Sequence, residues 1–140
     1  LVMIAAMLPV ATALENSGAL DLIVGALSGA LDGAPAIVTI FSLMLLTSLL
    51  SQVVSNTATA VLVAPVAIEI GSRFGIGPEA LLIAVAIAAS TAFATPVASP
   101  VNALVLGPGR YRFADYLRAG VALQLLVLLV GGALVALFAV

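Results

Sequence analysis

The sequence contains no cysteine, histidine, tryptophan or lysine among its 140 residues. Without cysteine and histidine it can form neither a disulfide scaffold nor a zinc site of the common types. The same absences exclude a Ser-His triad and a Ser-Lys dyad, so we expect that the protein is not an enzyme. Its four basic residues are all arginine and form no extended basic surface, which argues against a nucleic-acid partner.

Charged residues make up only 7% of the chain, whereas hydrophobic residues make up 64% and the mean hydropathy is +1.39. Soluble domains contain about a quarter charged residues, and a soluble protein this apolar would lack a water-facing surface. We therefore expect an all-α integral membrane protein that sits in a lipid bilayer. The chain also starts and stops inside apolar stretches, which predicts that it is a fragment without the N-terminal half of a longer protein.

The apolar stretches divide the chain into parts. We expect one membrane domain over residues 1–140, with a partial helix and a connecting helix over 1–33, a re-entrant hairpin over 35–73, a broken helix over 78–107 and a last transmembrane helix over 119–140. The connecting helix is either the end of a membrane helix or a helix lying at the interface. The hairpin is predicted because its second arm, residues 58–70, spans only ~20 Å and falls short of the ~30 Å hydrocarbon core. The last helix, at ~33 Å, is long enough to cross.

Three arginines, Arg110, Arg112 and Arg118, cluster with two tyrosines before the last helix. Such a cluster is typical of a juxtamembrane loop, and the positive-inside bias places it in the cytoplasm. The C-terminus and the open end of the hairpin would then face outside. We expect a multi-pass protein of the inner (cytoplasmic) membrane.

Polar residues interrupt the apolar stretches at 55–59 and at 95–102, where a helix running from 78 through 94 is expected to break. A helix that begins within the membrane presents unpaired N–H groups and a partial positive charge at its N-terminus. Ser55 or Asn56 can cap the first such helix, and Ser99 followed by Pro100 can begin the second. Two helix N-termini aimed at one point predict an anion site that needs no arginine or lysine.

The helix ends that precede the breaks present unpaired carbonyl oxygens, which suit a small hard cation such as Na⁺. Ser51, one turn before Ser55, adds a hydroxyl on that side. Neither break contains a carboxylate, so the ionisable group that a proton relay needs at depth is missing. The composition of the breaks therefore favours Na⁺ over H⁺.

Other interpretations of the polar residues stay open. Ser, Thr and Asn in membrane helices often only join helices, and we interpret Thr39, Thr47 and Gln124 in that way. A channel with re-entrant loops and a passive structural subunit are alternatives to a carrier. A membrane-embedded enzyme has no support in the residue inventory.

The runs SNTATAVLVAPVA and FATPVASPVNALVLG resemble the paired signatures of the divalent anion–sodium symporter family. AMLPVATALENSGALD and GPGRYRFADYLRAG are also similar to the C-terminal half of that family, particularly to bacterial permeases with regulatory soluble domains between their membrane halves. The resemblance covers nearly the whole chain. It implies the second repeat of an inverted-repeat transporter that works by an elevator-like motion, usually as a homodimer.

The resemblance also implies roles for residues in both breaks. The anion would contact Ser55, Asn56, Thr57, Ser99, Pro100 and Asn102. A second sodium site would use Ser51, Val54, Asn56 and Ala98, largely through backbone carbonyls, and the first sodium site would lie in the missing half.

The sequence departs from the family pattern at one point. Where dicarboxylate carriers of the family are expected to have Thr-Pro-Pro-Asn, this chain has Ser99-Pro100-Val101-Asn102. The resemblance therefore implies sodium-coupled transport of either a dicarboxylate or a sulfate-like anion. The alternative is a proton-coupled or antiporting carrier of the arsenite or citrate type.

Overall fold

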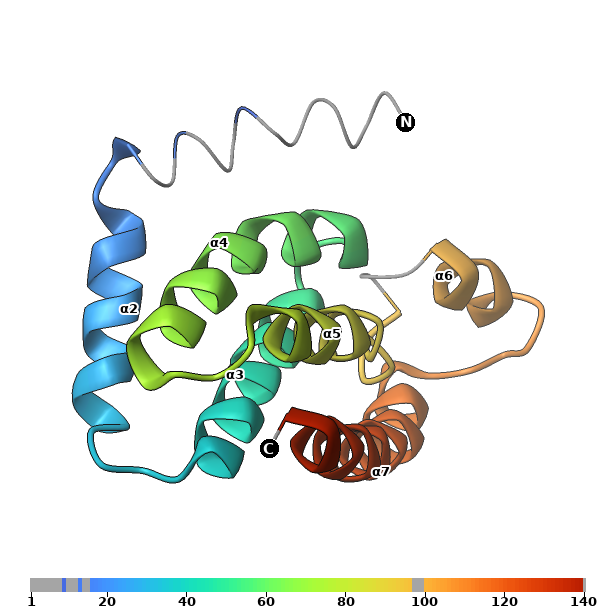
Figure 1. Ribbon diagram of the computed structural model, residues 1–140. Helices are drawn as coiled ribbons and strands as arrows, with labels where there is room; N and C mark the ends of the chain where they lie inside the picture. Colours follow the sequence, from blue (N-terminus) through green and yellow to red (C-terminus); the bar gives the residue numbers. More distant parts are fainter. Residues whose placement is uncertain (1–8, 10–12, 14–15, 97–99, 140) are drawn as a thin grey trace.

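The computed structural model describes residues 9, 13, 16–96 and 100–139, and these residues form helices and connecting segments without a strand. In chain order the helices are α2 (Ala19–Ala30), α3 (Ala36–Ser51), α4 (Asn56–Phe74), α5 (Pro78–Ala89), α6 (Pro100–Leu106) and α7 (Phe113–Ala139) (Figure 1). The prediction of an all-α chain is confirmed for the described residues. Most of the partial helix predicted at the start of the chain lies outside them.

The helices pack around α5, which lies against α3, α4 and α7. α3 also contacts α4 and α7, and α2 lies beside α4 at the opposite side of the view from α6 (Figure 1). Fully buried side chains fill the space between α3, α4 and α5: Ile40, Leu43, Met44, Ile70, Leu81 and Val85. Within a bilayer such contacts stabilise a bundle by van der Waals packing, because lipid tails are as apolar as the side chains.

Glycines on α7 let the neighbouring helices approach closely. A Cβ atom on Gly132 would lie 2.6 Å from Cε1 of Phe41 in α3, and one on Gly131 would lie 3.1 Å from Cγ2 of Ile87 in α5. The other face of α7 exposes large apolar side chains, including Leu129. By length and hydropathy α4 and α7 are each able to cross a membrane. One packed face and one apolar exposed face are what a helix between protein and lipid requires.

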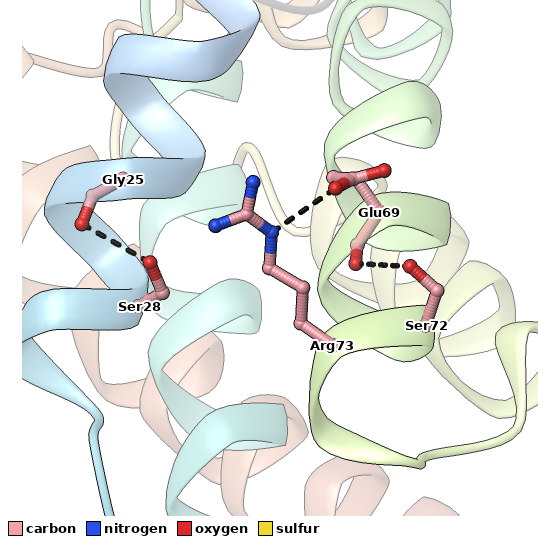
Figure 2. Close-up of polar contacts among 5 residues, drawn as sticks. All are labelled: Gly25, Ser28, Glu69, Ser72 and Arg73. Atoms are coloured by element: carbon pink, nitrogen blue, oxygen red, sulfur yellow. Dashed lines mark hydrogen bonds and ion pairs between the residues drawn. The ribbon is translucent and has the colours of Figure 1, made fainter.

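The second arm of the hairpin is longer than predicted. α4 has 19 residues, or ~28 Å, so the expectation that this arm is too short to cross is wrong. The run GSRF lies beyond the predicted end of this arm at residue 70, and it is helical as far as Phe74. In this last turn Arg73 Nε donates to Glu69 Oε1 at 3.0 Å, and Ser72 Oγ donates to the Glu69 carbonyl at 2.7 Å (Figure 2). The ion pair at i, i+4 supports the extra helical turn.

The helix that begins at Pro78 is shorter than predicted. α5 ends at Ala89 rather than Ala94, so the second break begins earlier in the chain. The hydroxyl of Thr91 donates to the carbonyl of Ala88 at 2.6 Å. A hydroxyl bonded in this way competes with the main-chain bonds that would continue the helix.

The last helix begins earlier than predicted. α7 starts at Phe113 rather than at residue 119. A carboxylate oxygen of Asp115 accepts a hydrogen bond from the main-chain N–H of Arg112 at 2.7 Å, so an acidic side chain in the first turn satisfies a donor at the N-terminus. Tyr116 therefore lies on α7 and not in the loop before it.

Candidate functional site at two helix breaks

The positions of the other helices can be described by the residues of α7 that they contact. Glycines in its C-terminal half lie against α3 and α5. Near its middle, Gln124 bonds to Gln52, the first residue after α3. Closer to its N-terminus, the hydroxyl of Tyr116 donates to the carbonyl of Asn102 in α6 at 2.9 Å. The segment from α5 through α6 therefore runs antiparallel to α7, and both helix breaks lie beside the middle of α7.

The first break consists of residues 52–55, between α3 and α4. Ser55 is the N-cap of α4, and its hydroxyl oxygen accepts a hydrogen bond from the N–H of Ala58 at 3.4 Å. Of the two caps that the sequence allowed, Ser55 and Asn56, the structure uses Ser55. The N-terminus of α4, with its partial positive charge, opens at the tip of the hairpin.

The second break separates α5 from α6, and its described residues are 90–96. Two of the predicted ligands, Ala98 and Ser99, lie outside the described residues. Pro100 is the first residue of α6, the position at which the sequence expected a helix to begin. The fixed φ of proline suits the first helical turn, where its missing N–H is not needed.

Asn102, which the family resemblance assigned to the anion, lies inside α6 and bonds to two residues of the second break. Its Nδ2 donates to the carbonyl of Ala92 at 3.2 Å and to the carbonyl of Thr95 at 3.3 Å. These bonds satisfy carbonyl groups that the break removes from helical pairing. Asn102 thus has a structural role, and its contact with an anion stays a prediction.

Hydrogen bonds join the two breaks directly. Thr95 Oγ1 in the second break donates to the main-chain carbonyl of Gln52 in the first at 2.8 Å. Gln52 Nε2 donates in turn to the carbonyl of Thr91 at 3.2 Å. The two polar interruptions, which are far apart in the sequence, therefore lie side by side.

The predicted cation ligands in the described part of the chain surround the end of α3. Ser51 is fully buried, and its Oγ donates to the carbonyl of Ser48 at 2.9 Å. Val54 is partly buried, as is the neighbouring Thr57, which the resemblance assigned to the anion. Oδ1 of Asn56 is buried and has no hydrogen-bond partner among the described residues. A buried acceptor without a partner costs about 1–3 kcal/mol, and a bound cation would offset that cost.

Several polar residues at the breaks were missed by the sequence analysis. Within the described residues, Gln52 Oε1 and Thr59 Oγ1 are also buried without a hydrogen-bond partner. Ser48 and Thr91 are buried and share a hydrogen bond between their hydroxyls. Gln124 was interpreted as joining helices, and its side chain does bond to both Gln52 and Ser48. Glutamines inside apolar runs were the signal that could have identified this cluster.

The described residues contain no group of three or more Asp, Glu, His or Cys side chains that could hold a metal ion. A cation at the breaks would therefore be held by hydroxyl, amide and main-chain carbonyl oxygens. Neutral oxygens of this kind, at the carbonyl ends of interrupted helices, bind Na⁺ in secondary transporters.

A sequence model of the citrate transporter family matches this chain in two overlapping segments, residues 1–76 and 43–140. Together the two segments cover the chain, which therefore belongs to this family of transporters and not to a family of enzymes. The resemblance to anion carriers, inferred from the residues of the two breaks, is confirmed at the level of the family.

Individual relatives are transporters by name. The chain is 41% identical over 93% of its length to the uncharacterized transporter YfbS of Escherichia coli and 35% identical over 91% of its length to the uncharacterized transporter sll0640 of Synechocystis. It is 32% identical over 86% of its length to the sodium-dependent high-affinity dicarboxylate transporter 3 of Caenorhabditis elegans. The matched region is 21% of each relative, so the chain spans about a fifth of the length of these curated relatives.

Proposed function

We propose that the full-length protein carries an anion together with Na⁺ across the cytoplasmic membrane, and that both bind where the two breaks meet. The observation that carries this proposal is a pair of hydrogen bonds between the two breaks beside the middle of α7: Gln52 Nε2 donates to the Thr91 carbonyl, and Thr95 Oγ1 donates to the Gln52 carbonyl. α7 has 27 residues, or ~40 Å, which exceeds the ~30 Å hydrocarbon core. A site beside its middle would lie near the bilayer centre, the usual depth of substrate and ion sites in secondary transporters.

The same geometry supports a re-entrant hairpin. α3 packs along the C-terminal half of α7 and ends beside its middle. α4 leads back, because Gly71 near its end lies against Leu81 of α5, while the first turn of α5 shares a cavity with Leu134 and Phe138 of α7. On this proposal the hairpin enters and leaves on the side of the C-terminal end of α7. Non-helical backbone at its tip would be tolerated if it lies against protein or lines a water-filled cavity.

A broken transmembrane helix is supported in a similar way. α5 packs against the C-terminal half of α7, and Phe93 and Ala94 of the second break lie against Gly120. α6 is joined to the first turn of α7 by the hydrogen bond from Tyr116 to the carbonyl of Asn102. Neither α5 nor α6 is long enough to cross a membrane alone, with 12 and 7 residues. We infer that the three segments form one interrupted crossing.

The anion is proposed to bind at the N-terminus of α4. The partial positive charge and unpaired N–H groups at this end favour a negative charge. Its proposed contacts are Ser55, Asn56 and Thr57 from the hairpin tip and Ser99, Pro100 and Asn102 from the second break. Such a site neutralises an anion without arginine or lysine, neither of which occurs in the two breaks.

Sodium is proposed to bind at Ser51, Val54, Asn56 and Ala98. The buried Oδ1 of Asn56 is available, since no described residue bonds to it. The carbonyls at the end of α3 add to the partial negative charge there. A divalent anion is costly to desolvate at a neutral site, and co-bound Na⁺ would offset that cost. Binding of one ion would therefore favour binding of the other.

We propose the larger architecture that the family resemblance implies. This chain would be the second of two inverted repeats, and a first repeat in the N-terminal half would supply another hairpin and sodium site. Transport would proceed by an elevator-like motion in a homodimer, with the C-terminal end of α7 outside.

The substrate class is proposed from the relatives. The C. elegans relative is named as a sodium-dependent dicarboxylate transporter, and the family description names citrate. The presence of Ser99 and Val101 around Pro100 keeps sulfate-like anions as candidates. The second candidate function is a proton-coupled or antiporting carrier of citrate or arsenite, for which the family description is the supporting observation.

Uptake by proteoliposomes of the full-length protein tests the proposal. Labelled succinate, citrate and sulfate are each supplied with an inward Na⁺ gradient, with an equal K⁺ gradient, and with an inward proton gradient alone. We expect uptake of at least one anion with Na⁺ and none with K⁺. Uptake that follows the proton gradient and ignores Na⁺ would contradict the sodium assignment and favour the proton-coupled carrier.

A further inference from the structure

A network of five polar side chains joins the first break, the second break and α7. Its members are Ser48, Gln52, Thr91, Thr95 and Gln124. We call this set the glutamine network. Ser48 and Thr91 are almost completely buried, and Gln124 is 7% exposed. None of the five is an anion or cation ligand in the proposed function.

The amide of Gln52 can lie in only one orientation. Its Nε2 is 3.3 Å from the carbonyl oxygen of Ser48 and 3.2 Å from that of Thr91. Carbonyl oxygens only accept hydrogen bonds, so the nitrogen and not the oxygen of the amide must face them. Nε2 also donates to Oε1 of Gln124 at 3.0 Å, and this contact orients the second amide.

The orientation of the Gln52 amide determines which atom donates in the other hydrogen bonds of the network. Nε2 of Gln124 donates to Oγ of Ser48 at 2.6 Å. The only hydroxyl proton of Thr91 is donated to the carbonyl of Ala88, so in the 2.7 Å contact between the hydroxyls Ser48 is the donor. The two protons of Gln52 Nε2 are shared among three acceptors, and Gln52 Oε1 has no partner among the described residues. The bonds of Gln124, Ser48 and Thr91 each run in one direction, and together they favour one arrangement of the two amides.

Gln52 is the residue through which the network reaches both breaks. It is the first residue of the hairpin tip, its side chain bonds to Thr91 at the start of the second break, and its carbonyl accepts the hydroxyl of Thr95 further along that break at 2.8 Å. Gln124 holds the same side chain from α7. A change in the orientation of Gln52 would therefore move one break relative to the other.

We propose that Gln52, oriented by Gln124, is the positioning residue that keeps the two breaks in register for ion binding. The inference rests on the proposed function, because it assigns the network to the site at which Na⁺ and the anion bind. A binding site built from two segments needs both held to within a fraction of an ångström, and their supporting side chains fix that geometry. Gln124 contributes to this site without being one of its proposed ligands.

Sodium-dependent thermal stabilisation of the full-length protein in detergent tests the proposal. The unfolding temperature is measured against NaCl concentration, with choline chloride keeping the ionic strength constant, and the concentration for half-maximal stabilisation is recorded. Gln124→Leu removes both amide bonds at nearly constant volume. We expect the half-maximal concentration to rise about tenfold, as the loss of one to two such bonds predicts. A purely structural role would lower the unfolding temperature without sodium and leave this concentration unchanged.

Thr47→Val is the matched control. Thr47 is a buried residue of α3 next to Ser48, and its hydroxyl donates to the carbonyl of Leu43 in the same helix at 2.7 Å. The variant removes a buried hydroxyl but no bond of the glutamine network. We expect its half-maximal sodium concentration to equal that of the wild type.

A second pair of variants keeps the test decisive if Gln124→Leu does not fold. Thr95→Val removes the hydrogen bond to Gln52, and Thr95→Ser keeps it. We expect the valine variant to raise the half-maximal sodium concentration and the serine variant to restore it. If Na⁺ stabilises the wild type no more than choline does, both the sodium site and the positioning role of Gln52 are wrong. If Na⁺ stabilises the wild type but Gln124→Leu or Thr95→Val has the same half-maximal sodium concentration as the wild type, only the positioning role of Gln52 is wrong.

Discussion

At the scale of single residues, Asn56 has the strongest structural support among the ligands proposed from the family resemblance. It begins α4, at the tip of the hairpin, and its Oδ1 is buried with no partner in the described part of the chain. Most buried polar groups in folded proteins are hydrogen-bonded, so a buried amide oxygen that stays unpaired suggests a ligand as its partner. Neighbouring Ser55 differs, because its hydroxyl already caps the helix.

Replacing Asn56 should therefore affect transport more than stability. We expect Asn56→Ala in the full-length protein to abolish sodium-driven uptake, while its expression and unfolding temperature without sodium stay close to those of the wild type. Removal of an acceptor that has no protein partner breaks no protein hydrogen bond. Uptake into proteoliposomes and a thermal melt measure the two effects.

Ser28→Ala is the control for that variant. Ser28 belongs to α2 and to neither break, and its hydroxyl donates to the Gly25 carbonyl of its own helix (Figure 2). The rate of sodium-driven uptake by Ser28→Ala should match that of the wild type. If Asn56→Ala also transports at the wild-type rate, the hairpin tip has no part in the mechanism.

At the scale of helices, the sequence predicted which segments exist but not where each one ends. The hairpin arms, the second break and the last helix all occur near their expected positions. The predicted ends differ from the structure where a side chain bonds to the main chain at the end of a helix. The carboxylate of Asp115 bonds at the early start of α7, and the hydroxyl of Thr91 bonds at the early end of α5. Such local bonds depend on geometry that apolar periodicity does not contain.

The sequence predicted one site shared by the two breaks, but not the hydrogen bonds that join them. Polar residues at 55–59 and 95–102 predicted two interruptions, and their composition suggested one shared site. The bonds that bring them together come from Gln52 and Gln124, which lie in apolar runs and resemble ordinary residues between helices. Only the packing of α3 and α5 against α7 brings these amides within reach of each other.

The approach of α7 to the second break depends on Gly120. A Cβ atom on this residue would meet the main-chain carbonyl of Phe93 and lie 2.7 Å from the Cα of Ala94. Both neighbours are backbone, which cannot rotate away as a side chain can. We expect Gly120→Ala to destabilise the full-length protein by about 1–3 kcal/mol, seen as a lower unfolding temperature, since overpacking forces the backbone to shift.

Gly29→Ala provides the comparison for that variant. Gly29 lies inside α2, and a Cβ atom there would have no neighbour within 4 Å. Alanine inside a helix is more favourable than glycine by about 0.5–1 kcal/mol, so this variant should be as stable as the wild type or more stable. Equal stability of Gly120→Ala and the wild type would contradict the close packing of α7 against the second break.

At the scale of the whole molecule, the proposed binding site requires the hairpin tip to lie at the depth of the membrane interior. The hairpin tip and the second break both lie beside the middle of α7. If α7 crosses the bilayer, a tip at this level has to lie inside the membrane, where protein or a water-filled cavity must surround its backbone. If the hairpin instead consisted of two full crossings, its tip would lie at the membrane surface opposite the α4–α5 loop.

Thiol labelling of the full-length protein in a cysteine-free background separates these arrangements. Three positions with exposed side chains or open space are suitable for single cysteines: Val53 at the tip, Gly77 between α4 and α5, and Gly107 between α6 and α7. A membrane-impermeant reagent is applied from each side, with and without Na⁺ and the transported anion. We expect Gly77→Cys and Gly107→Cys to react from opposite sides regardless of ligand, and Val53→Cys to be protected by Na⁺ and anion together. Reaction of Val53→Cys from the same side as Gly107→Cys, without any protection, would contradict the placement of the two breaks as a binding site within the membrane.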